Sequence, residues 1–217
     1  MPFYSYLRII QDVIFLISAG TAVFVKIKYG IKGNMQLLFW YNMQLTVGNI
    51  VSIAAHWFKI IDVDYFSRVL FASSILHYSL LSLFILSIEK PFMKTRAIKV
   101  YVALGITMAG LLLLVTSYRN TILLFSINNG TLFILSCIYF IRLFFSNQVI
   151  VVSREPSFCV VAGVFICMCV SLPFAAYKFF LLSNTNSQSS IYLILLFGYI
   201  IMHLFFIKAY LCLMKPT

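Results

Sequence analysis

Long apolar runs separated by short polar segments make up almost the whole chain. Each run is near the ~20 residues that a helix needs to cross the hydrocarbon core of a bilayer. Seven such runs are found, at Tyr6–Val25, Met35–His56, Tyr65–Ile88, Val100–Tyr118, Ile122–Phe145, Pro156–Leu182 and Ile191–Leu213. Between the fourth and the fifth, Arg119 and Asn120 predict a tight turn at the membrane interface. The pattern predicts an all-α polytopic membrane protein, a seven-transmembrane-helix bundle that forms a single domain over residues 1–217.

Composition leaves little material for anything outside the membrane. Of 217 residues, 63% are hydrophobic and 10% are charged, whereas a soluble domain carries about 25% charged residues. The lipid bilayer is therefore the first expected partner. The five cysteines lie within or at the ends of apolar runs and none has CxxC spacing, so we interpret them as small packing residues.

Basic residues are distributed unevenly between the two ends of the predicted spans. One side holds eleven of them, Lys26, Lys28, Lys32, Lys90, Lys94, Arg96, Lys99, Arg142, Arg154, Lys208 and Lys215. The other side holds five, Arg8, Lys59, Arg68, Arg119 and Lys178. Because cytoplasmic loops carry the excess of Lys and Arg, we expect the N-terminus outside and the C-terminus in the cytoplasm. The same distribution explains the net charge of +11 without a nucleic-acid partner.

The second apolar run carries a continuous polar stripe. Its members recur at intervals of three and four residues, at Asn42, Thr46, Asn49, Ser52 and His56. Polar groups facing lipid are unfavourable, so the stripe is expected to face the bundle interior. Interhelical hydrogen bonding and a wet cavity or ligand groove both explain it. In the fifth run, Asn129 and Ser136 repeat the pattern, with helix packing again one explanation.

Two histidines are predicted at similar depth in different helices. His77 lies about 18 Å along the third run and His203 about 18 Å along the seventh, and both runs go in the same direction. On the seventh run, Tyr192, Tyr199, His203 and Tyr210 share one face, whereas Lys208 points away from it. The imidazoles are compatible with structural hydrogen bonding, with ligand sensing or proton linkage, or with metal or haem binding. A metal site would need a third ligand.

Asp12 is the acidic residue within a predicted span. Either it forms a possible ion pair with His56 at the outer end of the second run, or it is an interfacial carboxylate in the headgroup region. Arg142 and Lys208 lie near the cytoplasmic ends of their runs, where long basic side chains can reach the headgroups.

Catalytic signatures of soluble enzymes, such as GxSxG, HExxH and phosphate-binding glycine loops, do not occur in the sequence. The sequence therefore favours a non-enzymatic sensory or regulatory module with a polar intramembrane cavity, without a predicted cofactor or metal. The alternative is a small-solute or proton-linked transporter, which the histidines and Pro173 in the sixth run favour. The expected cavity residues are Asn42, Asn49, His56, His77, Asn129, Tyr199 and His203. The sequence does not specify the identity of the ligand, and a membrane or signalling protein is a possible partner.

Two short stretches carry a resemblance to a known family. They are Arg154-Glu155-Pro156-Ser157-Phe158-Cys159, leading to Gly163, and Phe206-Ile207-Lys208-Ala209-Tyr210-Leu211-Cys212. With the helix spacing, the chain resembles a functionally uncharacterised seven-helix inner-membrane family of Bacteroidota-type bacteria. The resemblance implies a multi-pass protein of a bacterial inner membrane and gives no residue a role.

Overall fold

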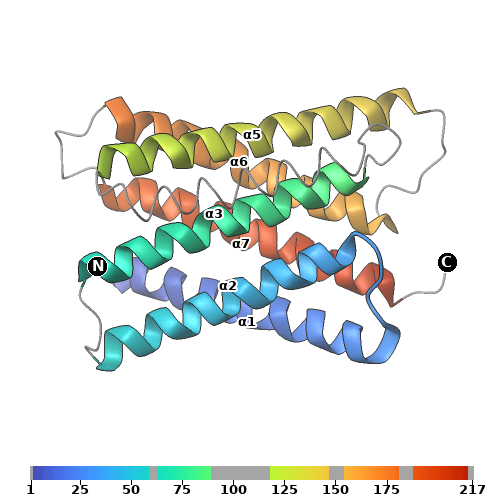
Figure 1. The fold of residues 1–217 in the computed structure, drawn as a ribbon, viewed down its shortest axis with the longest axis horizontal. Coiled ribbons are helices and arrows are strands. Elements are labelled where there is room, and N and C mark those ends of the chain that lie inside the picture. The colour runs from blue at the N-terminus through green and yellow to red at the C-terminus, as the bar shows by residue number, and fades with distance from the viewer. Residues whose placement is uncertain (1, 59–62, 89–117, 147–153, 181–187, 215–217) are drawn as a thin grey trace.

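The computed structural model describes residues 2–58, 63–88, 118–146, 154–180 and 188–214, and this part of the chain is helical apart from short connections. The helices are α1 (Pro2–Tyr29), α2 (Met35–Phe58), α3 (Val63–Ile88), α5 (Tyr118–Phe145), α6 (Pro156–Phe180) and α7 (Gln188–Leu213). They lie roughly along one common axis, as Figure 1 shows. The predicted all-helical fold is thereby confirmed for the described residues.

The described helices coincide with six of the seven predicted runs, and several are longer by up to one turn. The fourth run, Val100–Tyr118, lies outside the described residues except for Tyr118. The predicted turn at Arg119 and Asn120 is wrong, because both residues belong to the first turn of α5. Polar residues suit a first helical turn at an interface, since its backbone N–H groups lack intrahelical acceptors and stay close to water.

Helix direction alternates in a way that matters for topology. In Figure 1, α1, α3, α5 and α7 run from the left end of the bundle to the right, and α2 and α6 run back. The start of α1 and the end of α7 therefore lie at opposite ends. Because α3 and α5 run the same way, the end of α3 at Ile88 and the start of α5 at Tyr118 lie at opposite ends of the bundle.

The described helices form a closed ring. Each packs mainly on two neighbours, in the order α1, α2, α3, α5, α6, α7 and back to α1. Buried apolar side chains from all six helices fill the inside of the ring, among them Val25, Leu38, Phe84, Leu132 and Phe206. First and last helices are thus neighbours, and α7 brings its histidine and tyrosine face to α1.

Large apolar side chains are also exposed around the outside of the ring. Ile17 in α1, Val47 in α2, Ile134 in α5 and Leu204 in α7 are examples. Within the described residues, α1, α5, α6 and α7 contain stretches long and apolar enough to cross a membrane, and α3 contains a shorter apolar stretch, Leu76–Ile88. An apolar exterior on helices of this length defines a polytopic helical membrane protein, because exposure of so large an apolar surface to water is unfavourable in free energy.

A tight connection joins α1 to α2. Gly30, directly after α1, has φ +72°, and Gly33 has φ +62°, both in the left-handed region that glycine adopts without steric cost. The side-chain amide of Gln36 donates to the carbonyl oxygen of Ile31 at 3.1 Å and closes the turn. Nearby, the Lys26 ammonium lies 3.9 Å from the centre of the Phe39 ring, which adds a cation–π contact between the two helices.

Among the described helices, α6 and α7 have the most extensive contact. A Cβ atom added at Gly163 would lie 2.8 Å from Cβ of Phe205 and 3.1 Å from the carbonyl oxygen of Met202. A small residue at this position lets the two backbones approach, as is common between membrane helices. Gly163 therefore fixes the height and distance of α7, and with it the position of Met202.

Candidate ligand cavity

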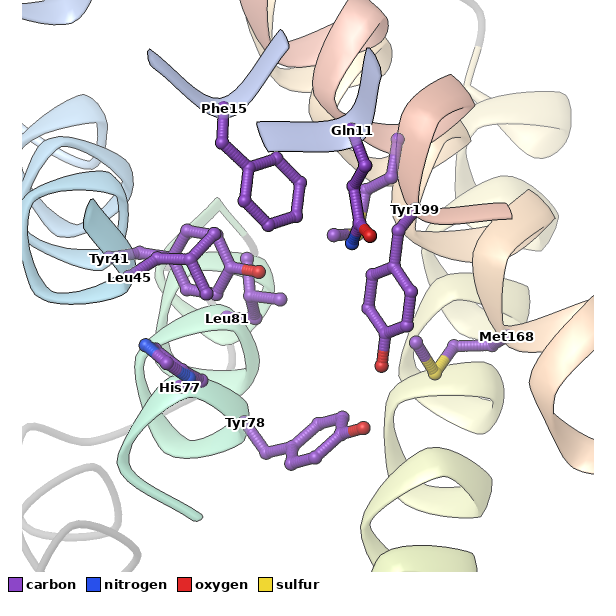
Figure 2. A pocket seen from close by; sticks show the side chains of 10 residues that line it. Gln11, Phe15, Tyr41, Leu45, His77, Tyr78, Leu81, Met168 and Tyr199 are labelled. Carbon is purple, nitrogen blue, oxygen red and sulfur yellow. The ribbon is translucent and has the colours of Figure 1, made fainter. Parts of the chain in front are cut away.

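A cavity of about 180 Å³ lies inside the ring of helices. Five of the six described helices line it: α1, α2, α3, α6 and α7. The lining residues are Gln11, Phe15, Tyr41, Leu45, His77, Tyr78, Leu81, Met168, Tyr199 and Met202. Figure 2 shows their side chains around the space, with α1 residues on one side and Tyr78 on the opposite side.

The walls are mostly apolar, with a few polar groups at separate points. Among the described lining residues, none carries a formal charge. The hydroxyl groups of Tyr78 and Tyr199 are hydrogen-bonded to each other, which joins α3 to α7. Figure 2 shows the side chains of Tyr41 and Gln11 pointing toward the same space. The cavity therefore suits a neutral molecule with a polar group, because a buried charge would lack a counter-charge there.

His77 is the imidazole that lines the cavity. Its ring forms a T-shaped contact with the Tyr41 ring, with centroids 5.4 Å apart. Its Nε2 atom is buried and has no hydrogen-bond partner among the described residues. A buried polar atom without a partner costs free energy, so a ligand or a water that supplied one would bind favourably at this point.

His203 lies beside the cavity and is fully buried. Its ring centroid is 4.0 Å from that of Phe15 and 6.3 Å from that of Tyr41, on which it stacks. Neither ring nitrogen has a hydrogen-bond partner within the described part of the chain. The two histidines thus pack on one tyrosine with different geometry: the His77 ring is inclined to the Tyr41 ring by 64°, and the His203 ring by 24°.

The described side chains of the polar stripe of α2 do not line the cavity. Asn42 is buried and donates from Nδ2 to the hydroxyl of Tyr210 at 3.0 Å, which ties α2 to α7. Asn49 is half-buried and does not line the cavity. The side chain of His56 lies outside the described residues. Tyr41, the residue beside Asn42, is the α2 side chain that enters the site together with Leu45.

The remaining expected residues lie elsewhere in the ring. Asn129 in α5 is fully buried, and both of its amide atoms lack hydrogen-bond partners among the described residues. Asp12 is half-buried one helical turn from Arg8, whose positive charge acts on it. The predicted pairing of Asp12 with His56 falls on a side chain outside the described residues. Lys208 is exposed, as the spacing along α7 predicts.

The lining includes residues that the sequence pattern did not single out. Three helices contribute them: α1 carries Gln11 and Phe15, α2 carries Tyr41, and α6 carries Met168. A period of three to four residues assigns them to an inner face, but it cannot separate a cavity wall from ordinary packing. The spacing of Tyr199 and His203 was informative because polar residues in a span must be buried inside the bundle.

No cluster of three or more potential metal-ligating side chains occurs among the described residues. All five cysteines have free thiols.

Comparison with known proteins gives no match to a protein-family model, a curated sequence or a solved structure. The class that the fold and the cavity define is a polytopic helical membrane protein.

Proposed function

We propose that this membrane protein is a non-enzymatic sensory or regulatory module that binds a small neutral ligand in its central cavity. The observation that carries the proposal is the cavity itself, lined by five helices and free of charged side chains among its described lining residues. Such a site can bind and orient a ligand, but its described residues supply no acid pair, nucleophile–base pair or metal set for catalysis.

The arrangement of the ring supports sensing. A ligand in the cavity contacts α1 and α7 from the two ends of the chain and also α2 and α3. A ligand that binds one packing arrangement of these helices better than another shifts the population toward it. A membrane or signalling protein partner that reads the outer surface of the ring would carry the response onward.

We further propose that the chain crosses a bacterial inner membrane seven times, with the N-terminus outside and the C-terminus in the cytoplasm. The apolar run Val100–Tyr118 would provide the crossing between α3 and α5, which run the same way (Figure 1). The end of the bundle that holds the last turns of α1 and α5 carries Lys26, Lys28 and Arg142. This basic end is the expected cytoplasmic side.

A small-solute or proton-linked transporter is the second candidate. Pro173 lies inside α6, where it removes one backbone hydrogen bond and provides a site for bending. His77 in the cavity wall could exchange a proton with a solute. The absence of charge among the described lining residues favours the first candidate, because a neutral apolar molecule enters a bilayer without a carrier.

An uptake assay separates the two candidates. The full-length protein is reconstituted into liposomes and tested with radiolabelled sugars, amino acids and organic acids, alongside a His77→Ala variant and a lipid-facing Leu204→Ala control. We expect no saturable uptake above empty liposomes. Saturable uptake that Leu204→Ala retains and His77→Ala loses would replace the sensory proposal with the transporter.

A further inference from the structure

The volume of the cavity limits the size of its ligand. An engineered apolar cavity of about 150 Å³ in another protein accommodates benzene. At about 180 Å³, the cavity between Phe15, Tyr41 and Met168 exceeds that volume by little. One six-membered ring with one or two small substituents therefore fits readily, whereas a fused two-ring molecule fits only tightly.

The walls indicate the chemistry of such a ring. Phe15 and Tyr41 provide aromatic surfaces, and Met168 and Met202 provide polarizable thioethers, which contact aromatic rings favourably. The described lining residues include no charged side chain that could pair with a charged ligand. Flat apolar walls without charge select a neutral ring.

Of the polar groups in the wall, which include Gln11 and Tyr41 (Figure 2), the His77 imidazole is the one with a buried atom that lacks a partner among the described residues. The hydroxyls of Tyr78 and Tyr199 bond to each other. The Nε2 atom of His77 has no partner among the described residues and belongs to a residue that lines the cavity. An imidazole nitrogen can donate to an oxygen or accept from a hydroxyl, depending on its tautomer. A single oxygen substituent on the ring would satisfy it.

We propose that the cavity binds a neutral, single-ring molecule with one oxygen substituent, of the phenol or cyclic ketone class, with its oxygen hydrogen-bonded to His77. This inference rests on the proposed ligand-binding function and specifies its ligand. The phenol class is the simplest that satisfies the size, the aromatic walls and the unpartnered nitrogen together.

Binding of four matched probes to the full-length protein in nanodiscs tests this inference, with empty nanodiscs to subtract partitioning into lipid. The probes are p-cresol, toluene without the oxygen, benzoate with a charge, and 2-naphthol with a second ring. We expect saturable binding of p-cresol and five- to tenfold weaker binding of toluene, which is about the value of one hydrogen bond. Binding of 2-naphthol should be weaker than that of p-cresol, and benzoate should not bind.

The variant His77→Phe keeps a ring in the wall and removes the nitrogen. It should weaken p-cresol binding about five- to tenfold and leave toluene binding unchanged. A merely structural role of His77 would weaken both probes together. Tyr29→Phe, an exposed tyrosine at the end of α1, serves as the control and should change neither.

The outcomes separate the ligand class from the function. Saturable binding of benzoate or 2-naphthol instead of p-cresol would overturn the ligand class and leave a ligand-binding cavity. Equal loss of p-cresol and toluene in His77→Phe would overturn the assigned hydrogen bond. Absence of saturable binding for every probe would overturn both the ligand class and the proposed function.

Discussion

Asn42 and Asn129 are both buried asparagines inside the ring, but their amides have different surroundings. Asn42 donates to the Tyr210 hydroxyl at 3.0 Å and so connects α2 to α7 across the bundle. Both amide atoms of Asn129 lack a partner among the described residues. A satisfied buried amide stabilises a helix bundle, whereas an unsatisfied one destabilises it. The two residues should therefore respond oppositely to an apolar replacement of similar size.

Asn42→Leu should lower the free energy of unfolding by about 1–2 kcal/mol, because it removes an interhelical hydrogen bond and leaves the Tyr210 hydroxyl unpaired. Asn129→Leu should leave the free energy of unfolding unchanged or raise it, since it removes an unpaired amide. Unfolding of the purified protein in mixed detergent micelles measures both. A loss of stability in Asn129→Leu as large as that in Asn42→Leu would show that the Asn129 amide has a partner.

At the level of helices, the contact between α6 and α7 determines how α7 sits in the ring. Gly163 faces Phe205 and the backbone of Met202, and Met202 lines the cavity. Gly130 in α5 and Gly20 in α1, by contrast, have no atom within 4 Å of an added Cβ. These glycines form a matched set in which only the surroundings differ.

Gly163→Ala should destabilise the protein, because the added methyl group forces α6 and α7 apart at a strain cost of about 1–3 kcal/mol. Gly130→Ala should be neutral or stabilising by up to about 1 kcal/mol, since alanine favours a helix over glycine. Thermal unfolding of both variants in the same detergent provides the comparison. Equal stability of the two variants would contradict the close approach of α6 to α7.

Helix positions were predictable from the sequence because apolar runs of membrane length are hard to place in any other structure. Most predicted bounds lie within about one turn of the observed ends. The error at Arg119 and Asn120 arose because polar residues occur both in turns and in the first turn of an interfacial helix. Hydropathy does not separate these two cases.

For the molecule as a whole, the order of helices around the ring could not be read from periodicity. The contact of α1 with α7, for example, depends on packing between segments far apart in the chain. For that reason, the sequence identified His77 and Tyr199 as inward-facing but gave no reason to place Gln11 and Phe15 beside them. The polar stripe of α2 predicted Asn42 as a cavity residue. In the structure Asn42 bonds to Tyr210, and the neighbouring Tyr41 lines the cavity instead.

The proposed topology is also a property of the whole molecule. Green fluorescent protein fused after Thr217 should fluoresce in bacterial cells. The C-terminus is expected in the cytoplasm, and the fluorescent reporter folds in that compartment. Alkaline phosphatase fused at the same position should be inactive. The reverse pattern would contradict the orientation, and an identical location of reporters at both chain ends would contradict an odd number of crossings.

The central claim is that the ring of helices encloses a cavity of ligand size, and a crystal of the full-length protein under xenon pressure tests it most directly. Xenon binds in apolar cavities of about 150 Å³ and scatters anomalously. We predict an anomalous peak between Phe15, Tyr41 and Met168 that disappears in a Leu81→Trp variant and persists in a lipid-facing Leu204→Trp control. Side chains filling that space, with no xenon peak inside the ring, would contradict the account.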